Sequence, residues 1–222
     1  MKNMKGLEGH VKRVTLLLTV AALVPAGSAL AALELRDING NATAVTADAE
    51  FAYDTVLDAT WYLTANNSGL SWYAARSWAA GLTVGTFKGW SLPSTDVPCS
   101  GYNCTNSQMG ALYYTALGNA AGGPLSNTDP FKNLQSYVSW SGTEYASDTR
   151  YAWNFGTYSG GQYVSGGHYA SGGQYANFKY YYFYALAVRP GDVAAVPEPG
   201  LVALLLSGLA GVMVMRRRLV GS

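Results

Sequence analysis

The first clear apolar pattern in the body of the chain predicts a pair of strands. Residues 50–63 (EFAYDTVLDATWYL) are rich in aromatic and β-branched side chains and are interrupted by Asp58, a turn-forming residue type. This pattern predicts a β-hairpin. Residues 32–48 are polar and mixed, and we expect them to form a lead-in strand and loop.

Two short helices are expected after the hairpin. In WYAARSWAAGL the apolar residues recur at helical spacing, and Gly81 lies near the end of the pattern. The first helix therefore has an apolar face of Trp72, Ala75, Ala79 and Leu82. In the second helix, Ser107 can cap the start and Gly118 can end the last turn. Its apolar face is formed by Met109, Leu112, Tyr113, Ala116 and Leu117.

After Pro130 the pattern changes to short antiparallel strands. We expect them at YVSWSG (137–142), YAWNFG (151–156) and YYYFYALAVRP (180–190). Helices in the first half and strands in the second indicate an α+β domain.

The N-terminal segment has the pattern of an export signal. Basic residues precede the apolar run VTLLLTVAALVPAG (14–27), and a small-x-small cleavage pattern precedes Ala32. Residues 1–31 are therefore predicted to be a signal peptide. An uncleaved membrane anchor is the alternative, but Pro25 and the small residues fit removal better.

The C-terminal segment combines a proline-bounded glutamate, an apolar run and a basic cluster. Residues 201–215 would form a helix of about 22 Å, shorter than a hydrocarbon core of roughly 30 Å. This transmembrane helix is therefore marginal. The basic stop keeps the C-terminus cytoplasmic and the body on the exported side; it consists of Arg216, Arg217 and Arg218.

The prolines before this helix restrict the chain. Pro197 and Pro199 each fix φ and lack an N–H, which favours an extended, exposed segment around Glu198. A processing enzyme embedded in the membrane could bind such a segment. Alternatively, Glu198 caps a helix that starts near Pro199, and both interpretations can hold together.

Charge and cysteine content narrow the functional classes. Between Ala32 and Val196 there are seven Lys and Arg against eleven Asp and Glu, a net charge of about −4. No basic patch remains to follow a nucleic-acid backbone, so we expect no nucleic-acid partner. The only cysteines, Cys99 and Cys104, are predicted to form a local disulfide in an oxidising compartment.

Residues 193–222 resemble a known sorting signal. The order Val196-Pro197-Glu198-Pro199-Gly200, apolar helix, three arginines is similar to the PEP-CTERM signal of Gram-negative bacteria. The resemblance implies processing by exosortase, a transpeptidase-like membrane enzyme, in cells that make exopolysaccharide. It implies a transient single-pass membrane anchor, then release or attachment at the cell surface or extracellular matrix.

Residues 49–192 resemble a second family through five short motifs that occur in order. These are Trp72-x5-Trp78-Ala79-Ala80, Gly89-Trp90-Ser91-Leu92-Pro93, Met109-Gly110-Ala111-Leu112-Tyr113, Tyr137-Val138-Ser139-Trp140-Ser141 and Ala187-Val188-Arg189-Pro190. Together they resemble the Lcl C-terminal domain, a bacterial extracellular domain, and imply a C-type-lectin-like fold. Ser91 stands where that family usually has arginine, so any role of that arginine is not carried over. Ser139 stands where an aromatic residue is common.

No arrangement of residues predicts catalysis. His168 is the only histidine of the mature body and has no carboxylate or cysteine close in sequence. Asp54 and Asp58 could in principle carry acid–base chemistry, but we expect turn residues and solvated faces. Calcium-dependent sugar binding needs clustered oxygen ligands, and the loops offer no Glu-Pro-Asn-like triplet. We therefore expect no catalytic residues, no metal site and no cofactor.

A six-residue repeat supplies a candidate binding surface. SGGQY, SGGHY and SGGQY recur over residues 159–175, so an extended chain would present three tyrosines on one face. Tyr163, Tyr169 and Tyr175 could then stack on sugar rings. The alternative, which the near-identical copies favour, is an expanded hairpin loop whose glycines supply the turns.

These features lead to one expected function and two alternatives. We expect a non-enzymatic surface or matrix protein whose lectin-like domain contacts extracellular polysaccharide. One alternative is an enzyme acting on envelope polysaccharide. The other is a purely structural coat component.

Overall fold

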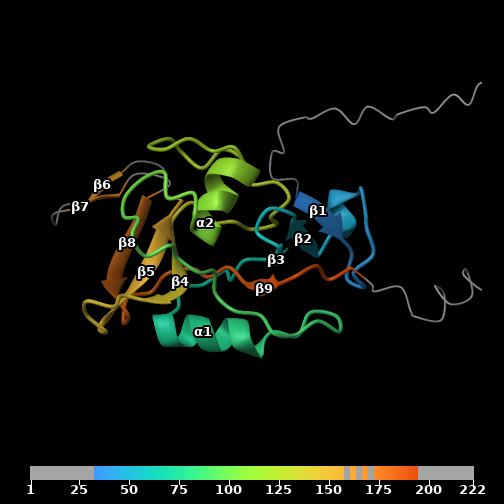
Figure 1. Ribbon diagram of the computed structural model, residues 1–222, viewed down its shortest axis with the longest axis horizontal. Helices are drawn as coiled ribbons and strands as arrows, with labels where there is room; N and C mark the ends of the chain where they lie inside the picture. The colour runs from blue at the N-terminus through green and yellow to red at the C-terminus, as the bar shows by residue number, and fades with distance from the viewer. Residues whose placement is uncertain (1–32, 158–160, 164–166, 170–172, 195–222) are drawn as a thin grey trace, which may run out of the picture.

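The computed structural model describes residues 33–157, 161–163, 167–169 and 173–194 (Figure 1). The predicted signal peptide and the tail from residue 195 onward lie outside these ranges. Within the ranges that are described, no helix has both the length and the apolar character needed to cross a membrane.

The first sheet joins the two ends of the described chain. Its strands are all antiparallel and lie in the order β1 (Leu33–Arg36), β2 (Phe51–Asp54), β3 (Ala59–Tyr62) and β9 (Val188–Pro190). The hairpin predicted over 50–63 is confirmed as β2 and β3. The lead-in segment supplies β1, so this sheet begins before the boundary placed at residue 49.

The second sheet lies at the other end of the long axis (Figure 1). It has the order β4 (Val138–Glu144), β5 (Tyr151–Gly156) and β8 (Gly173–Phe178). Two further strands, β6 (Gly161–Tyr163) and β7 (Gly167–Tyr169), pair with each other and, among the described residues, form a separate two-stranded sheet.

The prediction for the third strand of the second half is only partly right. Of residues 180–190, only β9 is a strand, because the preceding residues cross from one sheet to the other. On the way they make single bridges, from Phe183 to Leu70 and from Tyr184 to Ser139. The strand β8, which begins in the last copy of the glycine-rich repeat and continues to Phe178, was not predicted.

Both predicted helices are confirmed. The first, α1 (Trp72–Gly81), is capped by the Ser71 hydroxyl, which accepts a hydrogen bond from the Ala74 N–H. The second begins as α2 (Gln108–Gly110) and continues as η2 (Ala111–Ala116), a π-helical segment.

The expected ends of the second helix are also confirmed. The Ser107 hydroxyl accepts a hydrogen bond from the Gly110 N–H, and Gly118 follows the helix with φ of 66°. A short 3₁₀ turn, η1 (Thr46–Asp48), precedes β2. Helices and antiparallel sheets together make the α+β class that the sequence predicts.

Buried aromatic side chains hold the two sheets and α1 together. Trp140 is fully buried, its ring centroid lies 4.6 Å from that of Phe183, and its indole N–H donates to the Leu70 carbonyl. The Trp72 indole donates to the carbonyl of Ser141 in β4. Since buried indole N–H groups need acceptors, these two hydrogen bonds fix where α1 and the residues just before it lie against β4.

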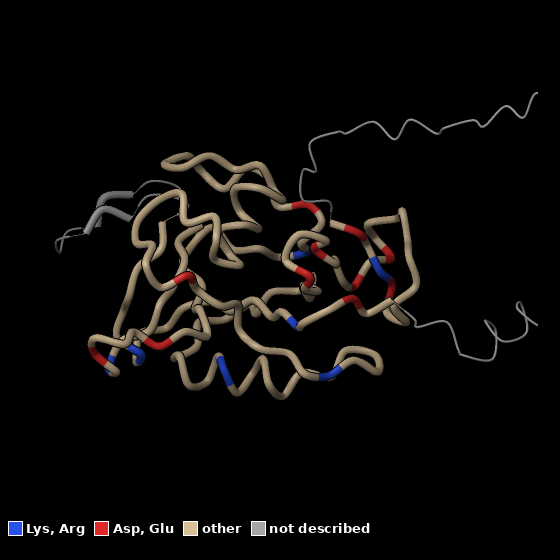
Figure 2. Tube along the Cα trace, viewed as in Figure 1, with Lys and Arg blue, Asp and Glu red and all other residues tan. Residues whose placement is uncertain are grey.

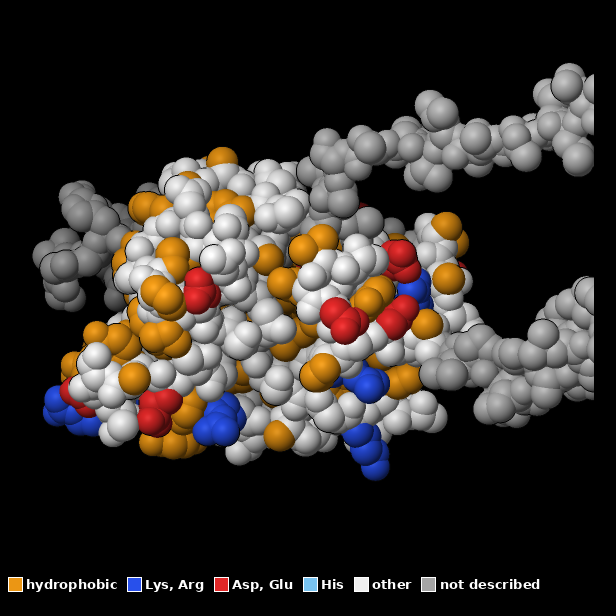
Figure 3. All heavy atoms as spheres, viewed as in Figure 1, with side chains coloured by type: hydrophobic (Ala, Val, Ile, Leu, Met, Phe, Trp, Pro, Cys, Tyr) orange, Lys and Arg blue, Asp and Glu red, His pale blue; other side chains and the backbone are white. Residues whose placement is uncertain are grey.

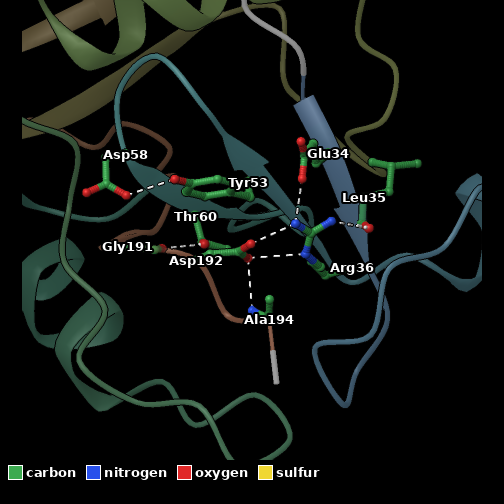
Figure 4. A network of polar contacts seen from close by, with 9 residues as sticks. All are labelled: Glu34, Leu35, Arg36, Tyr53, Asp58, Thr60, Gly191, Asp192 and Ala194. Carbon is green, nitrogen blue, oxygen red and sulfur yellow. Dashed lines mark hydrogen bonds and ion pairs between the residues drawn. The ribbon is translucent and has the colours of Figure 1, made fainter. Parts of the chain in front are cut away.

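An ion-pair network joins β1 to the segment after β9 (Figure 4). The Arg36 guanidinium donates from Nε and Nη2 to the two carboxylate oxygens of Asp192, at 3.2 and 2.7 Å. Its Nη2 also donates to Glu34 at 2.6 Å. These contacts tie the first and last described strands together, and the hydrogen bond to Asp192 is the main cause that raises the pKa of Arg36.

Candidate functional site

A cavity of about 520 Å³ lies between α1 and the end of β4. Helix α1 buries Trp72, Ala75 and Ala79, and residues on its opposite side line the cavity. The polar residues around the cavity are one cation, Arg76, and neutral hydroxyl groups; no lining residue is acidic. The lining residues are Tyr73, Arg76, Ser77, Ala80, Trp90, Ser91, Leu92, Ser94, Gly142 and Thr143.

The GWSLPS segment (residues 89–94) forms one wall of this cavity. Trp90 is buried and stacks on Phe51 of β2, with ring centroids 5.6 Å apart and planes 18° apart. Ser91 pairs with Val188 of β9 through two backbone hydrogen bonds of 2.9 Å. Gly89 has φ of 80°, a backbone conformation that favours glycine, and so permits the turn into this segment.

Arg76 projects from α1 without an acidic partner in the described part of the chain. Its guanidinium lies over the ring of Trp72, 4.7 Å from the centroid. Lys179 lies 4.2 Å from the same centroid and 5.4 Å from that of Tyr73, and it forms an ion pair with Glu144. A cation that lies over the face of an aromatic ring is attracted by the quadrupole of that ring.

Four exposed tyrosines lie on either side of Lys179, and we call them the tyrosine cluster. They are Tyr73, Tyr180, Tyr181 and Tyr182, with 62%, 63%, 40% and 72% of their surface exposed. The Lys179 carbonyl accepts the N–H of Trp72, so the two parts of the cluster adjoin at the start of α1. Hydrophobic side chains gather at this end of the molecule in Figure 3.

Neighbouring rings contact Tyr73, Tyr180 and Tyr181 of the cluster. Tyr180 stacks on Phe178 with centroids 5.1 Å apart and planes 18° apart, and Phe178 in turn packs on Tyr151 at 4.0 Å. Tyr181 meets Tyr180 edge to face at 5.0 Å. Partial desolvation and then the neighbouring Tyr181 raise the pKa of Tyr180, so its hydroxyl stays a neutral hydrogen-bonding group.

The repeat tyrosines do not lie on one continuous strand. Tyr163 is in β6 opposite Gly167, Tyr169 is in β7 opposite Gly161, and Tyr175 belongs to β8 of the second sheet. The antiparallel pairing of β6 with β7 fits the hairpin alternative. Tyr175 is half-buried, with its ring packed against Gly173. Tyr180, Tyr181 and Tyr182 of the tyrosine cluster, a few residues further on, were missed because exposure cannot be read from a run of aromatic residues.

The predicted disulfide between Cys99 and Cys104 is present, with the two Cα atoms 5.6 Å apart. The ring that it closes docks on β8, because Gly101 and Gln174 exchange two backbone hydrogen bonds. The side-chain amide of Gln174, a buried residue, also donates to the Cys99 carbonyl at 2.7 Å.

The two hairpin aspartates differ from expectation in one respect. Asp58 lies in the turn and accepts the hydroxyl of Tyr53, whereas Asp54 is the last residue of β2 and its carboxylate accepts the N–H groups of the turn residues Val56 and Leu57. Asp58 is exposed as predicted, but Asp54 is fully buried. The expectation of a solvated face is therefore wrong for Asp54, because the end of β2 is covered by the helix of the 108–116 region.

The other predicted site residues lie outside the described ranges. These are Pro197, Glu198 and Pro199 of the sorting motif and Arg216, Arg217 and Arg218 of the basic stop. His168 lies in β7, whose backbone alone is described. In the described residues no group of three or more His, Cys, Asp or Glu side chains comes together.

Comparison with known proteins gives no relative. No protein family, no curated protein and no solved structure matches this chain.

Proposed function

We propose that this chain is an exported, exosortase-processed surface or matrix protein whose folded domain is a non-enzymatic binding module for extracellular polysaccharide. The observation that carries the binding role is the tyrosine cluster beside the hydroxyl-lined cavity. The export role is supported by the signal-peptide pattern, by the resemblance of residues 193–222 to the PEP-CTERM signal, and by the disulfide, which suits an oxidising compartment.

The chemistry of the surface suits a sugar polymer. A pyranose ring offers an apolar C–H face and a rim of hydroxyl groups, so a binding surface needs aromatic faces and neutral hydrogen-bonding groups. The cluster supplies exposed rings; Tyr180 is held by stacking on Phe178, and Tyr73 by the packing of Lys179 against its face. The cavity supplies the hydroxyl groups of Ser91, Ser94 and Thr143.

The arrangement of charge agrees with this reading. Acidic residues gather around β1, β2 and the turn after β2, whereas α1 carries a basic residue and no acidic one (Figure 2). A polymer lying along the tyrosine cluster and α1 would therefore meet the less acidic end of the domain.

We further propose that the domain is C-type-lectin-like. The resemblance of residues 49–192 to the Lcl C-terminal domain implies that fold. Two helices on opposite sides of the molecule, and first and last strands that share one sheet, support it (Figure 1). In such a domain the loops between strands are free to vary, and Tyr180, Tyr181 and Tyr182 of the tyrosine cluster lie in the loop after β8.

A carbohydrate array tests the binding role. The full chain, purified in detergent, is compared with a Tyr180→Ser/Tyr182→Ser double variant, which removes two exposed rings and buries nothing new. The matched control is Tyr102→Ser. Tyr102 is 37% exposed and belongs to the disulfide ring, and this ring pairs with the end of β8 that lies away from the tyrosine cluster. We expect the double variant alone to lose the array signal.

Two other outcomes would replace this proposal. Release of soluble products from the bound polymer would favour the envelope enzyme. Absence of any array signal, together with ordered self-association that the double variant abolishes, would favour the structural coat component.

A further inference from the structure

A second cavity adjoins the cavity beside α1, which we call the first cavity. The second cavity has a volume of about 280 Å³. Ser91, Leu92 and Ser94 line both cavities, and Tyr73 of the tyrosine cluster lines the first one. The cluster, the first cavity and the second cavity therefore follow one another, and each shares residues with the next.

The segment that the two cavities share is held from both sides. Ser91 exchanges two backbone hydrogen bonds of 2.9 Å with Val188 of β9. The Pro93 carbonyl accepts the N–H of Gly142 and the hydroxyl of Ser141 in β4, both at 2.9 Å. A ligand that lies across residues 91–94 therefore meets a surface that is already ordered, which lowers the entropic cost of binding.

The second cavity is lined by an arginine that lacks hydrogen-bond acceptors. The guanidinium carbon of Arg189 lies 5.6 Å from the ring centroid of Phe87 and 6.0 Å from that of Trp90, so two aromatic rings help to hold it. Its Nε is buried and has no partner in the described part of the chain. Arg189 forms no ion pair with a described residue. Its two terminal nitrogens are not buried, and they are left to donate to a ligand.

The other polar residues of this cavity add one acceptor and one donor. Asp58 is exposed, and one of its carboxylate oxygens accepts the hydroxyl of Tyr53 at 2.9 Å, which leaves the other oxygen as an acceptor. The side-chain oxygen of Gln108 accepts the N–H of Ser94 at 2.7 Å, which leaves its amide nitrogen as a donor. The cavity thus carries one positive and one negative charge. Its apolar part consists of Leu57, Ala59, Leu92, Val188 and Pro190.

We propose that the second cavity binds a further, uncharged sugar unit of the same polysaccharide chain, through the hydroxyl groups of that unit. A hydroxyl group both donates and accepts hydrogen bonds, so it can accept from Arg189 and donate to Asp58. Convergent polar groups on a partly apolar wall are typical of such binding sites. This inference rests on the proposed function, and it adds that the site recognises several consecutive units of one chain.

The dependence of affinity on chain length tests the second cavity. The probe is the exopolysaccharide of the native host, partially hydrolysed with acid and separated by size. Isothermal titration calorimetry measures the binding of each size fraction to the full chain in detergent. We expect the affinity to rise with fragment length until both cavities are occupied, and then to level off.

The variant Arg189→Met isolates the second cavity, because methionine keeps an apolar side chain and removes every donor. A hydrogen bond to a charged group is worth about a tenfold change in dissociation constant. We therefore expect long fragments to bind about tenfold more weakly, and the shortest fragments that bind to be unaffected. The matched control is Arg150→Met, an exposed arginine 6.0 Å from the ring centroid of Tyr151 that lines neither cavity. This control should bind every fraction as the wild type does.

The outcomes separate this inference from the proposed function. A wild-type chain that binds neither the intact polysaccharide nor any fragment overturns both. Binding that does not depend on fragment length, or an equal loss for short and long fragments in Arg189→Met, overturns only the second cavity. If high NaCl selectively weakens the binding of long fragments, the contact is ionic and the uncharged unit is refuted.

A second variant keeps the test decisive if Arg189→Met does not fold. Asp58→Asn changes an exposed side chain and keeps the oxygen that accepts the Tyr53 hydroxyl, but it replaces the other oxygen by a donor. We expect this variant to show the same selective loss for long fragments. Wild-type affinity for every fraction in Asp58→Asn would overturn the second cavity.

Discussion

The Arg36–Asp192 ion pair offers a sharp test of how the two ends of the domain are joined. The perturbation is Asp192→Asn, which keeps the size of the side chain and the oxygen that accepts the Ala194 N–H. It removes the charge opposite Arg36, whose side chain is only 9% exposed.

The magnitude follows from burial. Removing one partner of a fully buried ion pair costs about 3–5 kcal/mol, because the other charge is left uncompensated. Here the Asp192 side chain is 24% exposed, and Glu34 remains as a second partner of Arg36. We therefore expect a smaller loss of about 2 kcal/mol in the free energy of unfolding, equivalent to a fall in Tm of about 4–8 °C.

Thermal unfolding followed by circular dichroism at pH 7 measures this loss. The matched control is Glu34→Gln, which removes the other carboxylate of the network. Because the Glu34 side chain is 49% exposed, its pair with Arg36 is screened by water and should contribute no more than about 0.5 kcal/mol. Equal losses in the two variants, or no loss in Asp192→Asn, would refute the view that β1 and the segment after β9 are locked together by a buried ion pair.

Three further predictions concern stability and ionisation. Ser71→Ala removes the hydroxyl cap of α1 and should cost about 1 kcal/mol, measured by urea unfolding; no change would mean that the cap is not used. Replacing Cys99 and Cys104 by serine opens the ring and should cost about 2 kcal/mol by the same assay, whereas an unchanged midpoint would count against the ring as a clamp. The side chain of Arg150 lowers the pKa of Asp148 to about 2, so the stabilising contribution is present above about pH 4 and is lost as the pH falls toward 2. In Arg150→Ala, the pKa of the Asp148 carboxyl followed by NMR should rise toward its ordinary value, while the backbone N–H of residue 150 still lowers it in part; a pKa that stays at about 2 would contradict this cause.

The sequence predicts elements whose signals are local. The helix α1 has a serine cap and apolar residues at helical spacing, and the hairpin of residues 50–63 has an aspartate at its turn; both occur where they were expected. The strand β8 was missed because its first three residues, Gly173 to Tyr175, belong to a glycine-rich repeat. It becomes a strand only because β5 lies beside it.

Features that depend on distant segments could not be predicted. The pairing of β9 with β3 joins residues that are far apart in sequence. The burial of Asp54 depends on where the second helix packs. The exposure of Tyr180 and Tyr182 depends on the path of the segment that crosses from β8 to β9. Side-chain exposure at such positions follows from tertiary packing, which apolar spacing along one segment does not encode.

We propose that this protein is exported and that exosortase then processes its C-terminal tail. Mass spectrometry of the mature protein tests this proposal most directly. The protein is isolated from its native host with and without the exosortase gene. We expect a mature N-terminus at Ala32 and, when exosortase is present, a C-terminus near Pro197 to Pro199 that lacks the arginine tail. Without the enzyme the tail should be retained. An intact Arg216 to Arg218 segment in the mature protein of the unmodified host would contradict the claim.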